Sequence, residues 1–281
     1  MAIVAKVQRL LTIILAAVAV GILAAVVTIR VIENHLIFFP PRYPEGFPPP
    51  QTYERDVEDV WLRTADGVKI NCFYHPNDAS KQVLLWFHGN AENIGYDLGH
   101  LRALATIGTN ILAVDYRGYG KSEGNPDEEG VYRDADAAYD YLINLRHFRA
   151  EDIIIYGNSL GGAVGVNLAS RRPCGGLIVQ SSFTSAVAMA RRMFAISLIG
   201  YVARSKFDSL HKIREVRAPI LVVHGTRDEV VPFAMGQELF ATAPEPKSFY
   251  AIEDAGHNNV MAAGGADYLA RLRTFIEAAS R

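Results

Sequence analysis

Residues 152–162 constrain the fold more than any other stretch of the chain. The run from Ile153 to Tyr156 is apolar and predicts a short buried strand, and the small apolar residues that follow predict a buried helix. The turn between them has the G-x-S-x-G pattern, with Ser159 at its centre. A strand, tight turn and helix in this order form a nucleophile elbow, in which a strained backbone lifts the serine Oγ out of the sheet edge. The alternative is a glycine-rich turn with an idle serine, and the flanking elements favour the catalytic interpretation.

The two glycines of this pattern have a steric role. Side chains at Gly157 and Gly161 would strike the neighbouring strand and helix, so both positions are expected to require glycine. The helix that follows Ser159 should direct free N–H groups and the positive end of its dipole at the serine.

Apolar runs and helical patterns alternate from about residue 55 to the end of the chain. Continuous apolar runs are typical of strands buried on both faces of a parallel sheet, with helices covering the two faces. The first two runs instead alternate apolar and polar residues around a turn, which predicts an antiparallel hairpin at one edge. We predict strands at 57–62, 68–74, 83–87, 111–114, 153–156, 177–179, 220–223 and 249–252, and helices at 93–107, 127–145, 159–171, 234–243 and 265–279. The fold class is therefore α/β, with an eight-stranded, mostly parallel sheet in one domain of residues 53–281.

An uncharged stretch, residues 10–29, precedes this domain. A helix needs about 20 apolar residues to cross a bilayer. A cleaved signal peptide is the alternative, but its apolar region is only about 7–15 residues long. We therefore predict one uncleaved transmembrane helix within an anchor of residues 1–32. Lys6 and Arg9 lie before the run and Arg30 after it, and this small bias favours a single-pass protein with its catalytic domain outside the cytoplasm.

Residues 33–52 are rich in proline and predict a stiff, extended linker without helix or sheet. The linker should keep the domain close to the membrane. Its apolar residues 36–39 either enter the lipid interface or cover the domain.

Composition excludes some classes of function. The 281 residues carry a formal net charge of −2, which gives no reason to expect nucleic-acid binding. Cys72 and Cys174 cannot form a disulfide framework and have no metal-ligand spacing, so we interpret both as small buried hydrophobic residues.

A serine nucleophile needs a base, and the chain offers one good candidate downstream of Ser159. In hydrolases with this elbow, an acid and then a histidine follow the nucleophile along the chain, each in a loop after a strand. His257 follows the last predicted strand and can reach over the sheet edge. His211 lies in a polar helical stretch that should face solvent, and His224 lies inside a strand run.

The acid that orients His257 is predicted to be Asp228. It follows the strand at 220–223, so its carboxylate can accept a hydrogen bond from the imidazole Nδ1–H. The competing carboxylates are Glu229, one residue later, Asp208, and Asp254, which is too close in sequence to reach the ring easily.

Two backbone N–H groups should stabilise the oxyanion that forms when serine attacks a carbonyl. One belongs to Leu160, directly after the nucleophile. The other is predicted to be that of Asn90, because Gly89 in the loop after the strand at 83–87 allows the backbone to approach closely.

Five motifs together resemble the α/β-hydrolase superfamily, and more closely its Bem46-like, ABHD13/ABHD17-type branch of serine hydrolases. They are HGNAEN at 88–93, DYRGYGKSEG at 115–124, GNSLGG at 157–162, GTRDEVVP at 225–232 and GHN at 256–258. The resemblance spans about residues 55–280 and implies the α/β-hydrolase fold, membrane attachment and hydrolysis of acyl esters or thioesters. Some eukaryotic members of that branch remove palmitate from proteins, but they carry a cysteine-rich, lipidated N-terminus that this sequence lacks, so we do not carry that activity over.

Residues 185–210 are interpreted as a small helical cap. Apolar residues including Met193 and Phe194 alternate there with arginines. They either pack on the sheet edge or line an acyl pocket, in which case Met193 and Phe194 bind substrate.

We predict a membrane-anchored serine hydrolase that acts on a small-molecule or lipid acyl substrate and needs no metal or organic cofactor. Ser159 attacks the acyl carbonyl, His257 takes its proton, Asp228 orients His257, and water releases the acyl-enzyme. A serine peptidase of the same fold and a non-catalytic hydrolase-like binding module are the alternatives.

Overall fold

The apolar runs pair into one eight-stranded sheet in the computed structural model, which describes residues 2–44, 46–52, 56–193 and 204–279. The strand order is β1-β2-β4-β3-β5-β6-β7-β8. The strands are β1 (Glu58–Arg63), β2 (Lys69–His75), β3 (Val83–Phe87), β4 (Asn110–Val114), β5 (Ile153–Asn158), β6 (Gly176–Gln180), β7 (Ile220–Gly225) and β8 (Lys247–Ile252). β1 pairs antiparallel with β2, and β2 with β4, while the other pairs are parallel. The predicted fold class and the hairpin at one edge are confirmed.

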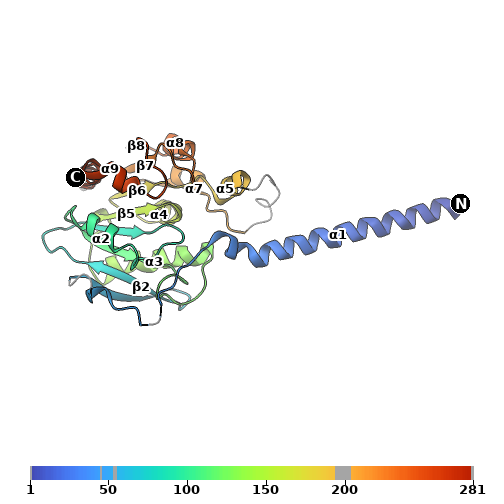
Figure 1. Cartoon of the computed structure of the whole chain (residues 1–281), viewed down its shortest axis with the longest axis horizontal. Coiled ribbons are helices and arrows are strands. Elements are labelled where there is room, and N and C mark those ends of the chain that lie inside the picture. Colours follow the sequence, from blue (N-terminus) through green and yellow to red (C-terminus); the bar gives the residue numbers. More distant parts are fainter. Residues whose placement is uncertain (1, 45, 53–55, 194–203, 280–281) are drawn as a thin grey trace.

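Helices cover both faces of this sheet (Figure 1). They are α2 (Leu98–Ala105), α3 (Glu128–Asn144), α4 (Leu160–Arg171), α5 (Ala186–Met193), α7 (Ser209–Lys212), α8 (Phe233–Thr242) and α9 (Val260–Ala279), with short 3-10 turns η1 (Pro50–Thr52), η2 (Ala150–Asp152) and η3 (Ile213–Glu215). Side chains alternate across β3, so that Leu85 packs in a core with α3, α4 and α8, whereas Leu84 and Trp86 pack with α2 and α9. Two hydrophobic cores therefore flank a sheet whose central strands are buried on both sides, as their unbroken apolar runs predict.

Helix boundaries differ from the prediction by more than one residue in two places. The helix expected at 93–107 begins only at Leu98, because residues 93–97 form a loop whose side chains and backbone bind other segments. The last helix begins earlier than expected, at Val260, and is kinked at Gly265, where φ is 51°.

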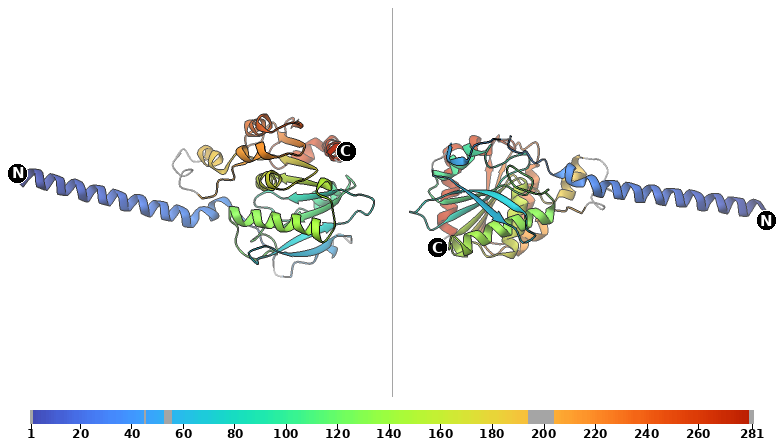
Figure 2. Two further views of the ribbon diagram at one scale, coloured as in Figure 1. Left: turned by 180° about the vertical axis from the view of Figure 1, so that it is seen from behind. Right: turned by 90° about the horizontal axis from the view of Figure 1, so that it is seen from below.

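The N-terminal helix α1 (Ala2–Ile37) projects away from the domain (Figures 1 and 2). Its stretch Val4–Ile29 has a mean hydropathy of 3.0 and lies entirely outside the protein core, so by length and composition it can cross a membrane. The expectation of a linker without helix is wrong for residues 33–37, because no proline precedes Pro40 to end the helix, and for the turn η1. Of the apolar residues 36–39, Phe38 covers the domain at 3% exposure, whereas Leu36 and Phe39 are exposed.

The parallel strands end at a common edge of the sheet. Ser159 follows β5, His88 follows β3, and Asp228 and His257 lie in the loops after β7 and β8. Residues far apart in sequence therefore meet at the carboxyl edge, where ligands bind in open α/β sheets.

Candidate active site

Ser159 occupies a strained turn between β5 and α4. Its φ is 53° and its ψ is −115°, a conformation that serine rarely adopts. Three hydrogen bonds hold its backbone: the Ser159 N–H donates to the carbonyl of Gln180 (2.8 Å), and the Ser159 carbonyl accepts from Ser182 Oγ (2.8 Å) and from the N–H of Gly162 (3.0 Å). The backbone geometry agrees with the predicted elbow.

The glycines of the elbow are sterically required. A Cβ on Gly157 would lie 2.1 Å from the carbonyl oxygen of Gly161, and one on Gly161 would lie 2.0 Å from that of Phe87. Any larger residue would therefore push α4 away from β5 or β3, as expected from the sequence.

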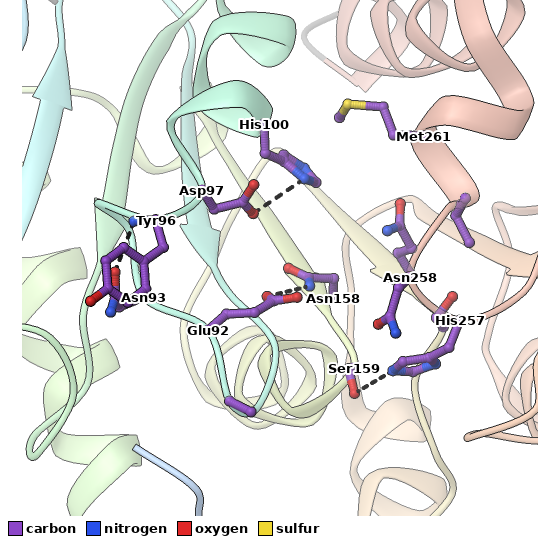
Figure 3. A pocket seen from close by; sticks show the side chains of 14 residues that line it. Glu92, Asn93, Tyr96, Asp97, His100, Asn158, Ser159, His257, Asn258 and Met261 are labelled. Atoms are coloured by element: carbon purple, nitrogen blue, oxygen red, sulfur yellow. Dashed lines mark hydrogen bonds and ion pairs between the residues drawn. The ribbon is translucent and has the colours of Figure 1, made fainter. Parts of the chain in front are cut away.

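A continuous chain of hydrogen bonds runs from Ser159 to Asp228. The His257 Nε2 lies 3.1 Å from Ser159 Oγ (Figure 3), and its Nδ1 lies 2.8 Å from Asp228 Oδ2. The backbone N–H of His257 also donates to Glu229 Oε2 (3.2 Å), which fixes the loop that carries the ring. The structure therefore brings together the three side chains that the sequence selected.

The carboxylate of Asp228 is fully buried and surrounded by donors. Its Oδ1 accepts from the N–H groups of Val230 (3.0 Å) and Val231 (2.7 Å), and its Oδ2 lies 3.3 Å from His224 Nε2. Burial alone would raise the pKa of Asp228, but the hydrogen bonds from His224 and His257 outweigh it and hold the pKa well below its usual range. Asp228 is therefore an anion next to the imidazole at neutral pH.

None of the competing carboxylates contacts the ring of His257. Asp254 is exposed and pairs with Arg227 (2.7 Å), and Glu229 binds the backbone of His257 rather than its ring. Asp208 caps α7 and lies 2.8 Å from His211, which is 74% exposed, as the sequence predicts for that histidine.

His224 belongs to the site, although its position inside a strand run predicts no such role. The only sequence signal is a histidine within an apolar strand, four residues before the acid. A polar ring at such a position is buried, and a buried ring needs a polar partner.

The two predicted oxyanion donors belong to two different segments at the carboxyl edge of the sheet. Leu160 is the first residue of α4, and the first N–H groups of a helix have no partner inside it. Asn90 lies in the loop after β3, where Glu92 Oε2 accepts the N–H of Gly89 (2.8 Å) and an N–H of the Asn158 amide (3.2 Å). The roles of Leu160 and Asn90 as oxyanion donors stay predictions.

A cavity of about 250 Å³ opens beside Ser159. Figure 3 shows Glu92, Asp97 and His100 on one side of it, and Asn258 and Met261 on the other. Most of the side chains that line it are polar, so it suits a group that forms hydrogen bonds.

Asp97 and His100 form a pair in this cavity, with Asp97 Oδ2 3.5 Å from His100 Nδ1. Burial, and next the charge of Glu92, raise the pKa of Asp97 to about 7. Burial lowers the pKa of His100 to about 4, so the ring stays neutral and its Nε2 contacts the hydroxyl of Tyr156 (3.0 Å).

The two predicted substrate contacts, Met193 and Phe194, belong to the cap. Met193 is the last residue of α5, and Phe194 lies outside the described residues. Their part in substrate binding stays a prediction.

Comparison with known proteins identifies the family. The family model for the alpha/beta hydrolase fold matches residues 82–196. Alpha/beta hydrolase domain-containing protein 17B of Xenopus tropicalis is 37% identical over 228 residues, which cover 79% of this chain and 76% of the relative. Protein 17C of Mus musculus is 36% identical over 226 residues, which cover 78% of this chain and 68% of the relative.

Solved structures agree on the fold. An esterase of Pyrococcus furiosus superposes with a TM-score of 0.71 at 20% identity, covering 87% of this chain and 98% of the esterase. An alpha-beta hydrolase of Vibrio vulnificus superposes with a TM-score of 0.65 at 23% identity, covering 78% of this chain and 82% of the other. Fold and site together define a hydrolase. The chain belongs to the alpha/beta hydrolase family, in its ABHD17-type branch, as the sequence motifs predict.

Proposed function

We propose that this chain is a membrane-anchored serine hydrolase that cleaves acyl esters or thioesters with a Ser159–His257–Asp228 triad. The observation that carries the proposal is the hydrogen-bonded chain from Ser159 Oγ (3.1 Å) through both ring nitrogens of His257 to Asp228 Oδ2 (2.8 Å). A serine in a strained turn, a histidine within hydrogen-bond distance and a buried anion behind it are the parts that nucleophilic acyl transfer needs.

In this mechanism, Ser159 Oγ attacks the acyl carbon while His257 Nε2 accepts its proton. The N–H groups of Leu160 and Asn90 stabilise the resulting oxyanion. Collapse of the tetrahedral intermediate expels the alcohol or thiol, which takes the proton from His257, and water repeats the sequence to release the acid. The low pKa of Asp228 keeps this group anionic throughout, so it holds the proton on Nδ1 and stabilises the imidazolium.

The polar lining of the cavity beside Ser159 indicates which part of the substrate binds there. Its side chains Glu92, Asp97 and Asn158 are poor partners for an acyl chain. We assign this side of the site to the polar portion of the substrate, the leaving alcohol or thiol, and the cap side, with Met193 and Phe194, to the acyl chain.

The helix α1 supports membrane anchoring. Its apolar stretch Val4–Ile29 is not buried by any of the residues that the structure describes, so packing against them does not explain its hydrophobicity. With positive charge at Lys6 and Arg9 ahead of it, we assign a single-pass topology with the catalytic domain outside the cytoplasm.

A fluorophosphonate probe and a hydrolysis panel test the activity. Full-length protein in detergent should be labelled at Ser159, and the Ser159→Ala variant should not be labelled. Ser159→Ala and His257→Ala should each lower kcat for acyl esters by about 10⁴-fold or more, and the double variant should cost little more because the residues act as a unit.

Two outcomes would contradict the proposal. Folded wild-type protein that the probe leaves unlabelled would favour a non-catalytic binding module. Faster cleavage of amides than of matched esters and thioesters would instead identify a peptidase.

A further inference from the structure

The segment between the membrane helix and the domain, residues 33–43, is docked on the domain; we call it the connecting segment. The carboxylate of Glu33 is buried and accepts the backbone N–H groups of Arg204 (3.0 Å) and Ser205 (3.2 Å). The ring of Phe38 is 3% exposed and packs edge-on against Phe207, with centroids 5.9 Å apart. The connecting segment therefore belongs to the folded domain.

The side chain of Asn90 holds the middle of the connecting segment. Its Oδ1 accepts the N–H of Phe39 (3.0 Å), and its Nδ2 donates to the carbonyl of Ile37 (2.6 Å). The hydroxyl of Tyr119 donates to the same Oδ1 (2.7 Å) and fixes the orientation of the amide. Asn90 thus binds the connecting segment through its side chain, while its backbone N–H is the proposed oxyanion donor.

The C-terminal end of the connecting segment binds residues 93–95, at the far end of the loop 88–95 that contains Asn90. Tyr43 Oη accepts the N–H of Gly95 (2.6 Å) and donates to Asp115 Oδ2 (3.3 Å). The Asn93 amide donates to the carbonyl of Pro41 (3.2 Å).

Two glycines of the domain, Gly95 and Gly120, leave the space that the Tyr43 side chain occupies. A Cβ on Gly95 would lie 2.4 Å from the Tyr43 hydroxyl oxygen, and one on Gly120 would lie 2.8 Å from its ring. Asp115 in turn accepts the N–H of Ile94 (2.9 Å) and lies 3.3 Å from His88 Nε2, so the contact of Tyr43 reaches the first residue of the loop.

We propose that the connecting segment holds the loop 88–95 in the geometry that catalysis requires. Asn90 and Tyr43 are the positioning residues that join the segment to this loop. The physical reason is that an oxyanion donor must be in place before the charge develops. A loop with a positive φ at Ala91 (58°) and irregular backbone needs outside contacts to stay in one geometry. The inference rests on the proposed function, because the oxyanion donor belongs to that mechanism.

The test uses full-length protein in detergent and compares Asn90→Ala and Tyr43→Phe with two matched controls. Asn90→Ala keeps the backbone N–H and removes only the amide. Tyr139→Phe, one control, removes a hydroxyl that donates to the carbonyl of Pro173 (2.6 Å). Asn110→Ala, the other, removes an amide that donates to the carbonyls of Ser80 and Gln82 (3.0 Å each) at the start of β4.

We expect Asn90→Ala and Tyr43→Phe to lower kcat and kcat/KM by the same factor, about tenfold or more, with KM unchanged, because the donor acts in the transition state. The rate of fluorophosphonate labelling at Ser159 should fall in parallel. The two controls should lower the melting temperature without changing kcat.

The outcomes separate this inference from the proposed function. If labelling of wild type occurs at Ser159 and both variants keep wild-type kcat and labelling rate, the connecting segment is only a structural attachment and the inference is overturned. If Asn90→Ala does not fold, Tyr43→Phe decides alone. A wild-type protein that the probe does not label would overturn the proposed function and this inference with it.

Discussion

The ring of His224 lies against the carboxylate of Asp228, with Nε2 3.3 Å from Oδ2 and both side chains fully buried. The same Nε2 lies 2.9 Å from the carbonyl of Val231, which can only accept, so the Nε2 carries a hydrogen. Asp228 therefore contacts two imidazoles, that of His257, which also contacts Ser159, and that of His224.

His224→Phe should weaken this arrangement while keeping a ring of similar size. Loss of one donor should raise the pKa of Asp228 towards its ordinary value, since hydrogen bonds from His224 and His257 depress it. A depressed acid pKa stabilises the fold above the unfolded pKa, and this stability is lost as pH falls through the folded pKa. As the pH is lowered, the variant should therefore lose stability and activity at a higher pH than the wild type does. At neutral pH its free energy of unfolding should be about 1–3 kcal/mol lower.

A pH profile of kcat and of melting temperature checks this prediction. His211→Phe is the control, because that ring is 74% exposed and its carboxylate partner is Asp208, which is not a member of the triad. An acid limb identical in wild type and His224→Phe would show that His224 does not support Asp228.

The fold could be read from the sequence because buried strands leave a direct pattern. β3 is an unbroken apolar run, as is β5 from Ile153 to Tyr156, and the hairpin of β1 and β2 alternates around Asp66 and Gly67. Helix ends could not be read as well. The helix expected at 93–107 begins five residues late, because Tyr43, distant in sequence, binds the N–H of Gly95 and holds a loop at 93–97.

Asp228→Asn should lower kcat by about 10⁴-fold, because the amide cannot hold the His257 tautomer that accepts the serine proton. Asp254→Asn is the matched control, since Asp254 lies in the same loop as His257 but pairs with Arg227 at the surface. Steady-state kinetics on one acyl ester compare the two. The reverse ranking would mean that Asp254 orients the base in solution.

The order of residues along the chain predicts the triad but does not predict the contacts of Asn90. Ser159, Asp228 and His257 follow strands that end at one edge, so topology alone brings them close. The contacts of Asn90 with Ile37 and Phe39 join segments that no local pattern connects, and a proline-rich composition does not say which surface it packs on.

Asp97→Asn should change how stability depends on pH. The raised pKa of about 7 means that the folded protein binds a proton that the unfolded chain has already lost, so stability falls as pH rises from about 4 to about 7. The variant carries no charge there and should lose this slope, becoming more stable than wild type above pH 8. Chemical unfolding between pH 5 and 9 measures it, with exposed Asp78→Asn as the control. Parallel slopes in wild type and Asp97→Asn would contradict the assignment.

Membrane anchoring predicts that full-length protein stays in the membrane fraction after washing with high salt and at alkaline pH. A variant with Ile14→Lys and Val20→Lys should be released, because a charge at the bilayer centre costs about 2.5–3.5 kcal/mol per residue on insertion scales. Mass spectrometry of the wild type should find the N-terminus ahead of Leu10. Release of the wild type by these washes, or a mature N-terminus beyond residue 20, would exclude an uncleaved anchor.

The cap assignment predicts how activity depends on acyl chain length. Each buried methylene contributes about 0.8 kcal/mol, so kcat/KM should rise by up to roughly fourfold per methylene until the pocket is full. Met193→Lys and Phe194→Lys should flatten this rise and leave acetyl esters unaffected, because a charge in the acyl pocket penalises only chains long enough to reach it. Leu145→Lys is the control, as Leu145 is 68% exposed directly after α3. A preference for acetyl esters that neither cap substitution changes would remove the acyl pocket from the cap and leave a hydrolase of short esters.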